Sequence, residues 1–148
     1  MKLLKYLDYP PIWLIAFMAL AWGISEFHAP FGSAFLMTGA GIIFLGVALA
    51  IWAAVSFLMA RTTIIPHRPP SALVDTGPFE RMRNPIYLAD LMILIGWSLA
   101  IGAPAALVLV PIFWWVLLKR FVLPEEARLE QHLGQPYLDY KSRVRRWI

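Results

Sequence analysis

The chain has 148 residues, of which 60% are hydrophobic and only 15% are charged, and its mean hydropathy is +0.66. Because soluble domains carry about 25% charged residues, this composition excludes an ordinary soluble domain and indicates an integral membrane protein. The chain has no cysteine, which excludes disulfides and thiolate chemistry. We expect a single all-α domain over residues 1–148, since the sequence shows no extended linker, repeat or low-complexity tract.

Four apolar segments predict four transmembrane helices. They run roughly from Pro11 to Phe27, Ala34 to Ala60, Tyr87 to Ala103 and Pro104 to Val122. A helix needs about 20 residues to cross about 30 Å of hydrocarbon, so the second segment is long enough to tilt. The third and fourth are short and are joined by IGAPAA, which predicts a tight hairpin. A cleavable signal peptide is an alternative interpretation of the first segment.

The basic residues predict which side of the membrane each connection occupies. With four spans, all 13 Lys and Arg residues fall on one side, and the connections SEFHAPFGS and IGAPAA contain none. The positive-inside rule then places both termini and the 61–86 loop in the cytoplasm, as for a bacterial inner-membrane protein. The net charge of +4 is therefore a topology signal and a contact surface for anionic membrane lipids, not a nucleic-acid site.

Three glycines in the second segment, Gly39, Gly41 and Gly46, let another group approach the backbone closely. Packing against a neighbouring helix is the favoured interpretation, and a bound ligand is the other.

A polar stretch, GPFERMRNPIYL at residues 77–88, directly precedes the third apolar segment. Pro85 disfavours helical geometry at Asn84, so the third helix should begin at or just after Pro85 with Asn84 as its N-cap. A helix start whose arginines contact lipid phosphates is one complete interpretation. The other is an anion site, because the N–H groups of a helix N-terminus and the nearby Arg83 favour a carboxylate or a phosphate.

A second polar cluster, LPEEARLEQHLGQPYLDYKSRVRRWI, follows the fourth segment. Pro124, Glu125 and Glu126 are typical of the first turn of a new helix, where the dipole favours acids, and Gly134 should end that helix. A second short helix should follow, as an amphipathic tail on the membrane surface. Its apolar side would hold Tyr137, Tyr140 and Val144. The adjacent carboxylates could instead bind an ammonium group.

The two clusters have opposite charge preferences, and both adjoin the cytoplasmic end of the predicted hairpin. A zwitterionic amino acid group would satisfy both at once. S-adenosylmethionine carries one carboxylate and one ammonium at its methionyl end, so the two clusters together indicate this cofactor.

SALVDTGPFERMRNPIYL followed by EEARLEQHLGQPYLDYKSRVRRWI resembles the isoprenylcysteine carboxyl methyltransferase superfamily, to which the phosphatidylethanolamine N-methyltransferases are related. The resemblance covers about residues 37–148. It implies an S-adenosylmethionine-dependent methyltransferase in the membrane, whose C-terminal helical segment folds over a cytoplasmic cofactor pocket. It also implies a lipophilic substrate that enters from the bilayer.

The resemblance matches Asn84, Pro85 and Tyr87 to the family's His/Asn-Pro-x-Tyr motif, and matches Glu125 and Glu126 to its Glu-Glu pair. Arg83 is added to this set because it lies next to the anion site predicted at the start of the third helix. The cofactor-binding residues expected in total are Ser71, Ala72, Leu73, Val74, Phe79, Arg83, Asn84, Pro85, Tyr87, Glu125 and Glu126.

Two residues are expected to bind the substrate, Asp90 and Arg120. Asp90 would lie at the membrane edge, where a carboxylate is costly unless it is paired or functional, and a salt bridge to Arg83 or Arg120 is the alternative account. The prenylcysteine branch usually has His at the position of Asn84, so this chain is more similar to the phospholipid branch. The sequence is consistent with three substrate classes: a phospholipid amine, an isoprenoid or fatty carboxylate, and a small lipophilic xenobiotic.

Methyl transfer from a sulfonium is an in-line displacement that requires alignment and exclusion of water, with no metal ion. Two functions of other classes are the alternatives. One is a membrane reductase of the related sterol reductase type, which would need a nicotinamide cofactor. The other is a non-catalytic membrane scaffold, which would show no saturable cofactor binding.

The distribution of basic residues generates a topology prediction. Reporter fusions at Ser33 and Gly102 should read as periplasmic or external, and a fusion at Arg68 should read as cytoplasmic, because only the 61–86 connection carries basic residues. Paired alkaline phosphatase and fluorescent protein fusions measure this directly. An external signal from the Arg68 fusion would overturn the predicted orientation.

Overall fold

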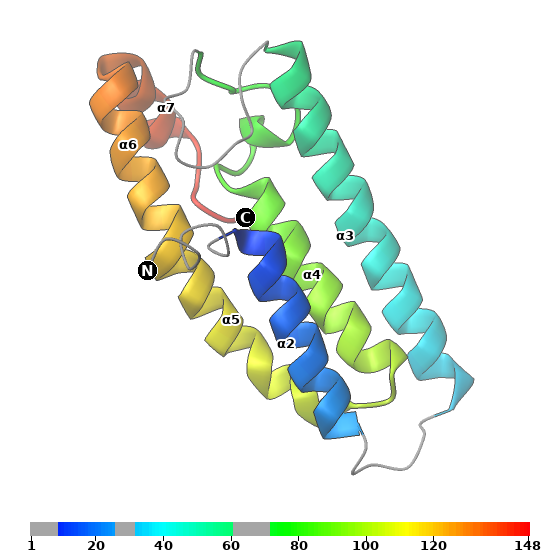
Figure 1. Cartoon of the computed structure of the whole chain (residues 1–148). Helices are drawn as coiled ribbons and strands as arrows, with labels where there is room; N and C mark the ends of the chain where they lie inside the picture. Colours follow the sequence, from blue (N-terminus) through cyan, green and yellow to red (C-terminus); the bar gives the residue numbers. More distant parts are fainter. Residues whose placement is uncertain (1–8, 26–31, 61–71) are drawn as a thin grey trace.

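The computed structural model describes residues 9–25, 32–60 and 72–148, and these residues form a bundle of helices (Figure 1). The described part contains no β-strand; its one β-bridge joins Met82 to Arg145. The elements are α2 (Pro10–Ser25), α3 (Ser33–Met59), the 3-10 helix η1 (Gly77–Glu80), α4 (Pro85–Ala100), the 3-10 helix η2 (Pro104–Val108), α5 (Leu109–Leu117), the π-helix η3 (Leu118–Val122), α6 (Leu123–Leu133) and α7 (Gln135–Arg143).

The all-α prediction is confirmed for the described residues, and each of the four apolar segments forms a helix. Two helices are long and apolar enough to cross a membrane: Ser33–Met59 and the continuous helix Pro104–Leu133. The other two apolar helices, α2 and α4, have 16 residues each and are shorter than a usual span. The count of four spans therefore stays a prediction.

Helices α3 and α4 approach each other so closely that only glycine fits at the crossing. A Cβ atom on Gly39 would lie 2.5 Å from the carbonyl oxygen of Gly96 and 2.5 Å from the amide nitrogen of Ala100. A Cβ on Gly46 would also lie tight against α4, 3.1 Å from the carbonyl oxygen of Ala89. Gly41 faces open space. The packing interpretation is therefore confirmed for Gly39 and Gly46, and Gly41 takes no part in it.

The apolar side chains between α2, α4 and α5 form the main core. Leu94, Phe113, Leu117 and Val122 are fully buried there, and the rings of Phe17 and Phe113 lie 4.8 Å apart. The turn that joins α4 to η2 has Gly102 at a φ of 70°, a left-handed conformation that suits glycine. The predicted tight hairpin is thus confirmed.

The helix after the fourth segment differs from its prediction. A break was expected before Pro124, but η2, α5, η3 and α6 form one continuous helix from Pro104 to Leu133. Proline has no N–H and its ring presses on the carbonyl four residues earlier. The wider π turn at Leu118–Val122 accommodates Pro124 without ending the helix. Glu125 and Glu126 lie in the first turn of α6 as predicted, but α6 continues η3, so this turn has no free N-terminus whose dipole would favour the two acids.

The two C-terminal helices pack back onto the segment that precedes α4 (Figure 1). Gly134 ends α6 with a φ of 60°, as predicted. The predicted apolar side of α7 is buried, but against Leu73, Leu129 and Leu133 rather than a membrane surface. The Tyr140 hydroxyl also donates a hydrogen bond of 2.8 Å to the carbonyl of Phe79.

The α3–α4 crossing can be tested with two glycines of the same helix. Gly39→Ala should lower the free energy of unfolding by about 1–3 kcal/mol, because the new methyl group meets backbone atoms that cannot move independently. Gly41→Ala should be neutral or stabilising by up to about 1 kcal/mol, because alanine favours a helix and this position is open. Thermal unfolding in detergent compares the two, and equal effects would refute the close packing.

Candidate functional site

The C-terminal tail is attached to the start of α4 by backbone hydrogen bonds. The N–H of Arg83 donates to the carbonyl of Arg145 at 2.9 Å, next to the bridge between Met82 and Arg145. The side-chain amide of Asn84 donates to the carbonyl of Arg146 at 3.2 Å. Two stretches that lie 62 residues apart in the sequence are therefore held side by side.

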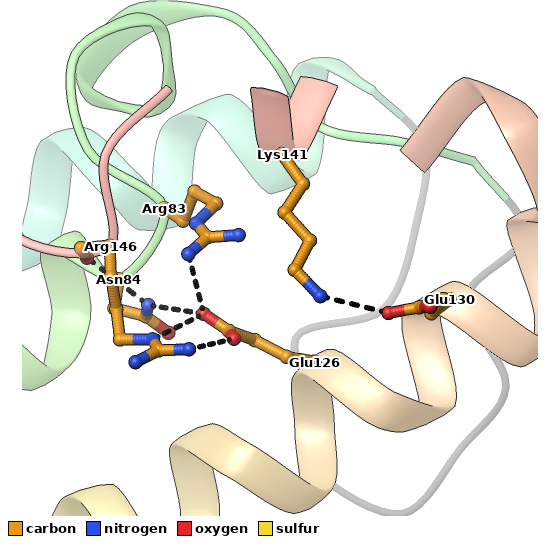
Figure 2. Close-up of polar contacts among 6 residues, drawn as sticks. All are labelled: Arg83, Asn84, Glu126, Glu130, Lys141 and Arg146. Atoms are coloured by element: carbon orange, nitrogen blue, oxygen red, sulfur yellow. Dashed lines mark hydrogen bonds and ion pairs between the residues drawn. The ribbon is translucent and has the colours of Figure 1, made fainter. Parts of the chain in front are cut away.

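The carboxylate of Glu126 lies at the centre of this contact (Figure 2). Arg146 donates two hydrogen bonds to it, from Nε to Oε1 at 3.0 Å and from Nη2 to Oε2 at 2.8 Å. Arg83 Nη2 lies 3.4 Å from Oε1, and the Asn84 amide donates to the same oxygen at 3.4 Å. The Glu126 side chain is only 7% exposed, so its charge needs these partners.

In this cluster, the carboxylate of Glu126 and the guanidinium of Arg146 each favour the charged form of the other. Glu126 lies beyond the apolar run that ends at Val122. Burial by itself would raise the pKa of Glu126, but the hydrogen bonds from Arg146 and the positive charge of Arg83 outweigh it and lower that pKa. The hydrogen bonds to Glu126 in turn raise the pKa of Arg146. Both partners are therefore charged at neutral pH.

Asn84 does not cap α4 with its side chain. The helix begins at Pro85 as predicted, but the Asn84 side chain makes no capping hydrogen bond. Its amide is instead used by Glu126 and by the carbonyl of Arg146. The predicted cap is wrong because distant partners compete for the same side chain.

The two adjacent acids face different partners. The hydroxyl of Tyr87 donates a hydrogen bond of 2.6 Å to Glu125 Oε2, whereas Glu126 binds the two arginines. Successive residues of a helix point about 100° apart, since one turn holds 3.6 residues. Glu125 therefore reaches a cavity beside α4, and Glu126 holds the tail.

This cavity has a volume of about 320 Å³, within the range of about 300–1,000 Å³ that is usual for small-molecule sites. Side chains from α2, α3, η1, α4 and α6, together with residues adjoining these elements, line it. They are Tyr9, Pro10, Pro11, Phe57, Phe79, Arg83, Asn84, Pro85, Ile86, Tyr87, Asp90 and Glu125. Most of the wall is apolar, and a few polar groups converge on it.

Two of the polar residues that line the cavity have buried atoms without partners. Within the described part of the chain, Arg83 Nε and Nη1 find no hydrogen-bond acceptor, and Asp90 Oδ2 finds no donor. Native structures leave few buried polar atoms unsatisfied, because each one costs about 1–3 kcal/mol. Arg83 and Asp90, one basic and one acidic residue, thus line the same mostly apolar cavity. Each has hydrogen-bonding atoms without a partner in the described part of the chain.

Comparison with known proteins decides the family. The family model described as phospholipid methyltransferase matches residues 34–136, which include most of the cavity wall. The chain belongs to this family. An uncharacterized protein of Haemophilus influenzae is 40% identical over 63 residues, a match that covers 43% of this chain and all of that protein. No solved structure matches the chain.

Membership of the family confirms the resemblance noted from the sequence and indicates a methyltransferase that acts on membrane lipids. The matched region holds both sequence motifs, because the Asn84–Tyr87 motif and the Glu125–Glu126 pair lie inside residues 34–136. The cavity lies between these two motifs.

Seven of the residues selected from the sequence line the cavity of this family member. They are Phe79, Arg83, Asn84, Pro85, Tyr87, Asp90 and Glu125. The others lie outside the set of residues that line it. Val74 packs against Ala53 and Phe79, Leu73 packs against the α7 cluster, and Ala72 is half-buried. Glu126 binds the arginines, Arg120 lies over the Trp13 ring at 5.3 Å, and Ser71 is outside the described residues.

One wall of the cavity and one end of the ion cluster are not predicted by the sequence motifs. Tyr9, Pro10 and Pro11 come from the start of α2, and Phe57 comes from α3. These residues lie far from both motifs in the sequence, and their residue types are ordinary for a membrane segment. Arg146 was interpreted as one of several basic residues that set the membrane topology, because no feature of the surrounding sequence distinguishes it from the other basic residues there.

The ion cluster generates a stability prediction with a matched control. Glu126→Gln should lower the free energy of unfolding by about 2 kcal/mol or more, because it leaves the buried Arg83 without its counter-charge. Glu130→Gln should change it by less than about 0.5 kcal/mol, because the Glu130–Lys141 pair is well exposed. Denaturant unfolding followed by tryptophan fluorescence compares them. Similar losses in both variants would show that the cluster does not hold the tail.

Proposed function

We propose that this protein transfers a methyl group from S-adenosylmethionine to a lipophilic substrate that enters from the bilayer. One observation carries the proposal. A single cavity, in a chain of the phospholipid methyltransferase family, is lined both by Arg83, whose Nε and Nη1 atoms have no hydrogen-bond partner among the described residues, and by Glu125. The methionyl end of the cofactor carries one carboxylate and one ammonium, which match these two charges.

The residues present fit this cofactor. Arg83 Nε and Nη1 would donate to its carboxylate, helped by the N–H groups at the start of α4. Glu125, oriented by the Tyr87 hydroxyl, would accept from its ammonium. Phe57 and Phe79 offer apolar faces on which an adenine ring can pack. In this proposal Glu126 holds Arg83 in position and does not itself touch the cofactor. Residues 71–74 are included because the family resemblance implies that they bind the cofactor.

The cofactor would supply a methyl carbon bound to a positively charged sulfur. The chain would align the cofactor with the substrate and exclude water from the reacting atoms. The apolar walls of the cavity would exclude water from the reacting atoms, which would favour transfer of the methyl group to the substrate over transfer to water. Arg83 and Glu125 would fix one end of the cofactor and thereby the direction of the methyl group.

We also propose that the four apolar helices all cross the membrane, with both termini on the cytoplasmic side of a bacterial inner membrane. The helices α6 and α7 and the segment before α4 gather at one end of the bundle (Figure 1), which is the end where the basic residues of the C-terminal part lie. This end would face the cytoplasm and its soluble cofactor, while the apolar helices face lipid. The C-terminal helices would then cover the cofactor pocket.

Cofactor binding tests the proposal without knowledge of the substrate. Wild-type protein in detergent should bind S-adenosylhomocysteine saturably in a calorimetric titration. Glu125→Gln should weaken this affinity by about tenfold to thirtyfold, the effect of one charge-assisted hydrogen bond of about 1.5–2 kcal/mol. Glu130→Gln, on the exposed side of the same helix, should leave it unchanged.

Each failure has a distinct meaning. A wild-type protein that does not bind S-adenosylhomocysteine would refute the proposed cofactor. Saturable binding that Glu125→Gln does not weaken would keep the cofactor but would move its ammonium away from Glu125.

A further inference from the structure

Two arginines bind the carboxylate of Glu126, and they differ in geometry and in exposure. Arg146 engages both oxygens, from Nε to Oε1 at 3.0 Å and from Nη2 to Oε2 at 2.8 Å. Arg83 contacts only Oε1, with Nη2 at 3.4 Å. The Arg83 side chain is 9% exposed, whereas that of Arg146 is 35% exposed. The more exposed arginine therefore makes the shorter, two-point contact with the buried acid.

This division determines which donors Arg83 has left. A two-point pair of arginine and carboxylate is a strong charge-assisted contact, so Arg146 supplies most of what the buried Glu126 needs. Arg83 gives it only Nη2, and its Nε and Nη1 have no partner among the described residues. Without Arg146, the charge of Glu126 would draw the other donors of Arg83 toward itself, because a buried carboxylate requires compensation. Those donors would then be lost to a ligand in the cavity.

The C-terminal tail holds Arg146 in place on both sides. The carbonyl of Arg145 accepts the N–H of Arg83 at 2.9 Å, and the carbonyl of Arg146 accepts the Asn84 amide at 3.2 Å. The next residue, Trp147, packs against the main core, with its ring 6.4 Å from that of Trp114. A side chain on a fixed backbone loses less conformational freedom when it binds. The contact of Arg146 with Glu126 is therefore stronger than that of an ordinary surface arginine.

We infer that Arg146 is a positioning residue for the cofactor: its two-point contact with Glu126 keeps Nε and Nη1 of Arg83 available for the cofactor carboxylate. This inference rests on the proposed function, because it adds a residue to the same site. Arg83 lines the cavity, whereas neither Arg146 nor Glu126 is among the residues that line it. Arg146 also lies outside residues 34–136, the region that the family model matches. The site therefore extends into the C-terminal tail.

A purely structural role for Arg146 gives a different expectation. If its ion pair only held the tail, its loss would deform the cavity and weaken every ligand alike. Loss of the Arg83 donors would instead weaken only ligands that carry a carboxylate. Methylthioadenosine shares the adenosine and the sulfur of S-adenosylhomocysteine but lacks the amino acid group. Comparison of these two ligands therefore separates the two roles.

The test is calorimetric titration of the full chain in detergent with both ligands. Arg146→Gln should weaken S-adenosylhomocysteine binding by about tenfold, the effect of one charge-assisted hydrogen bond, and leave methylthioadenosine binding unchanged. Arg146→Lys keeps the charge but lacks the planar fork, so it should lose only about threefold, again for S-adenosylhomocysteine alone. Arg145→Gln is the matched control. This neighbour is exposed and reaches Arg83 only through its backbone, so both affinities should stay the same.

A double-mutant cycle tests whether Arg146 acts through Arg83. Arg83→Gln should itself weaken S-adenosylhomocysteine by about tenfold or more, because it removes the proposed donors. Arg146→Gln added to Arg83→Gln should cause no further loss, since residues that act as one unit are not additive. Losses that add in the double variant would assign Arg146 an independent effect and overturn the inference.

The outcomes separate this inference from the proposed function. Equal weakening of both ligands in Arg146→Gln, or no weakening of either, would overturn the inference and leave the cofactor proposal intact. Wild-type protein that binds no S-adenosylhomocysteine would refute the cofactor itself, and the inference with it. Wild-type protein that binds both ligands equally well would move the methionyl end away from Arg83 and would also overturn the inference. If Arg146→Gln does not fold, the same ligand comparison in Arg146→Lys decides.

Discussion

The buried charge of Glu126 is the constraint on which the polar end of this protein depends. A carboxylate that is almost fully enclosed persists only with compensating charges and hydrogen bonds. Its partners are Arg83 and Asn84, from the segment before α4, and Arg146, from the C-terminal tail. One side chain therefore joins three parts of the chain, and the shape of the cavity follows from where it brings them.

Glu125, the neighbour of Glu126 on α6, belongs to the cavity wall and not to the ion cluster. Glu125 faces the cavity because it is turned about 100° away from Glu126 on α6. Arg83 takes part in both environments, since Nη2 contacts Glu126 and the other two nitrogens have no partner among the described residues. The ion cluster thus fixes the guanidinium of Arg83 in one position, which is the rigidity that the proposed cofactor site requires.

Helix packing supplies the apolar part of the site. The glycine contact between Gly39 and Gly96 draws α3 and α4 together, and residues of both helices, Phe57 and Asp90, line the same cavity. The polar groups proposed for the cofactor lie around the start of α4, whereas Asp90 lies deeper in the helix bundle. The cavity therefore extends from the polar start of α4 into a more apolar part of the bundle.

The sequence by itself determined the helical segments, the helix starts and stops at Pro85 and Gly134, the family, and seven of the residues that line the cavity. These features follow from local patterns: apolar runs, backbone restrictions of proline and glycine, and short motifs. Only the tertiary structure decided that Asn84 bonds to the tail instead of capping α4, that Glu125 and Glu126 separate, and that Arg146 compensates a buried charge. These are contacts between residues up to 62 positions apart. A side chain bonds to whichever partner packing brings within reach, and no local pattern records that choice.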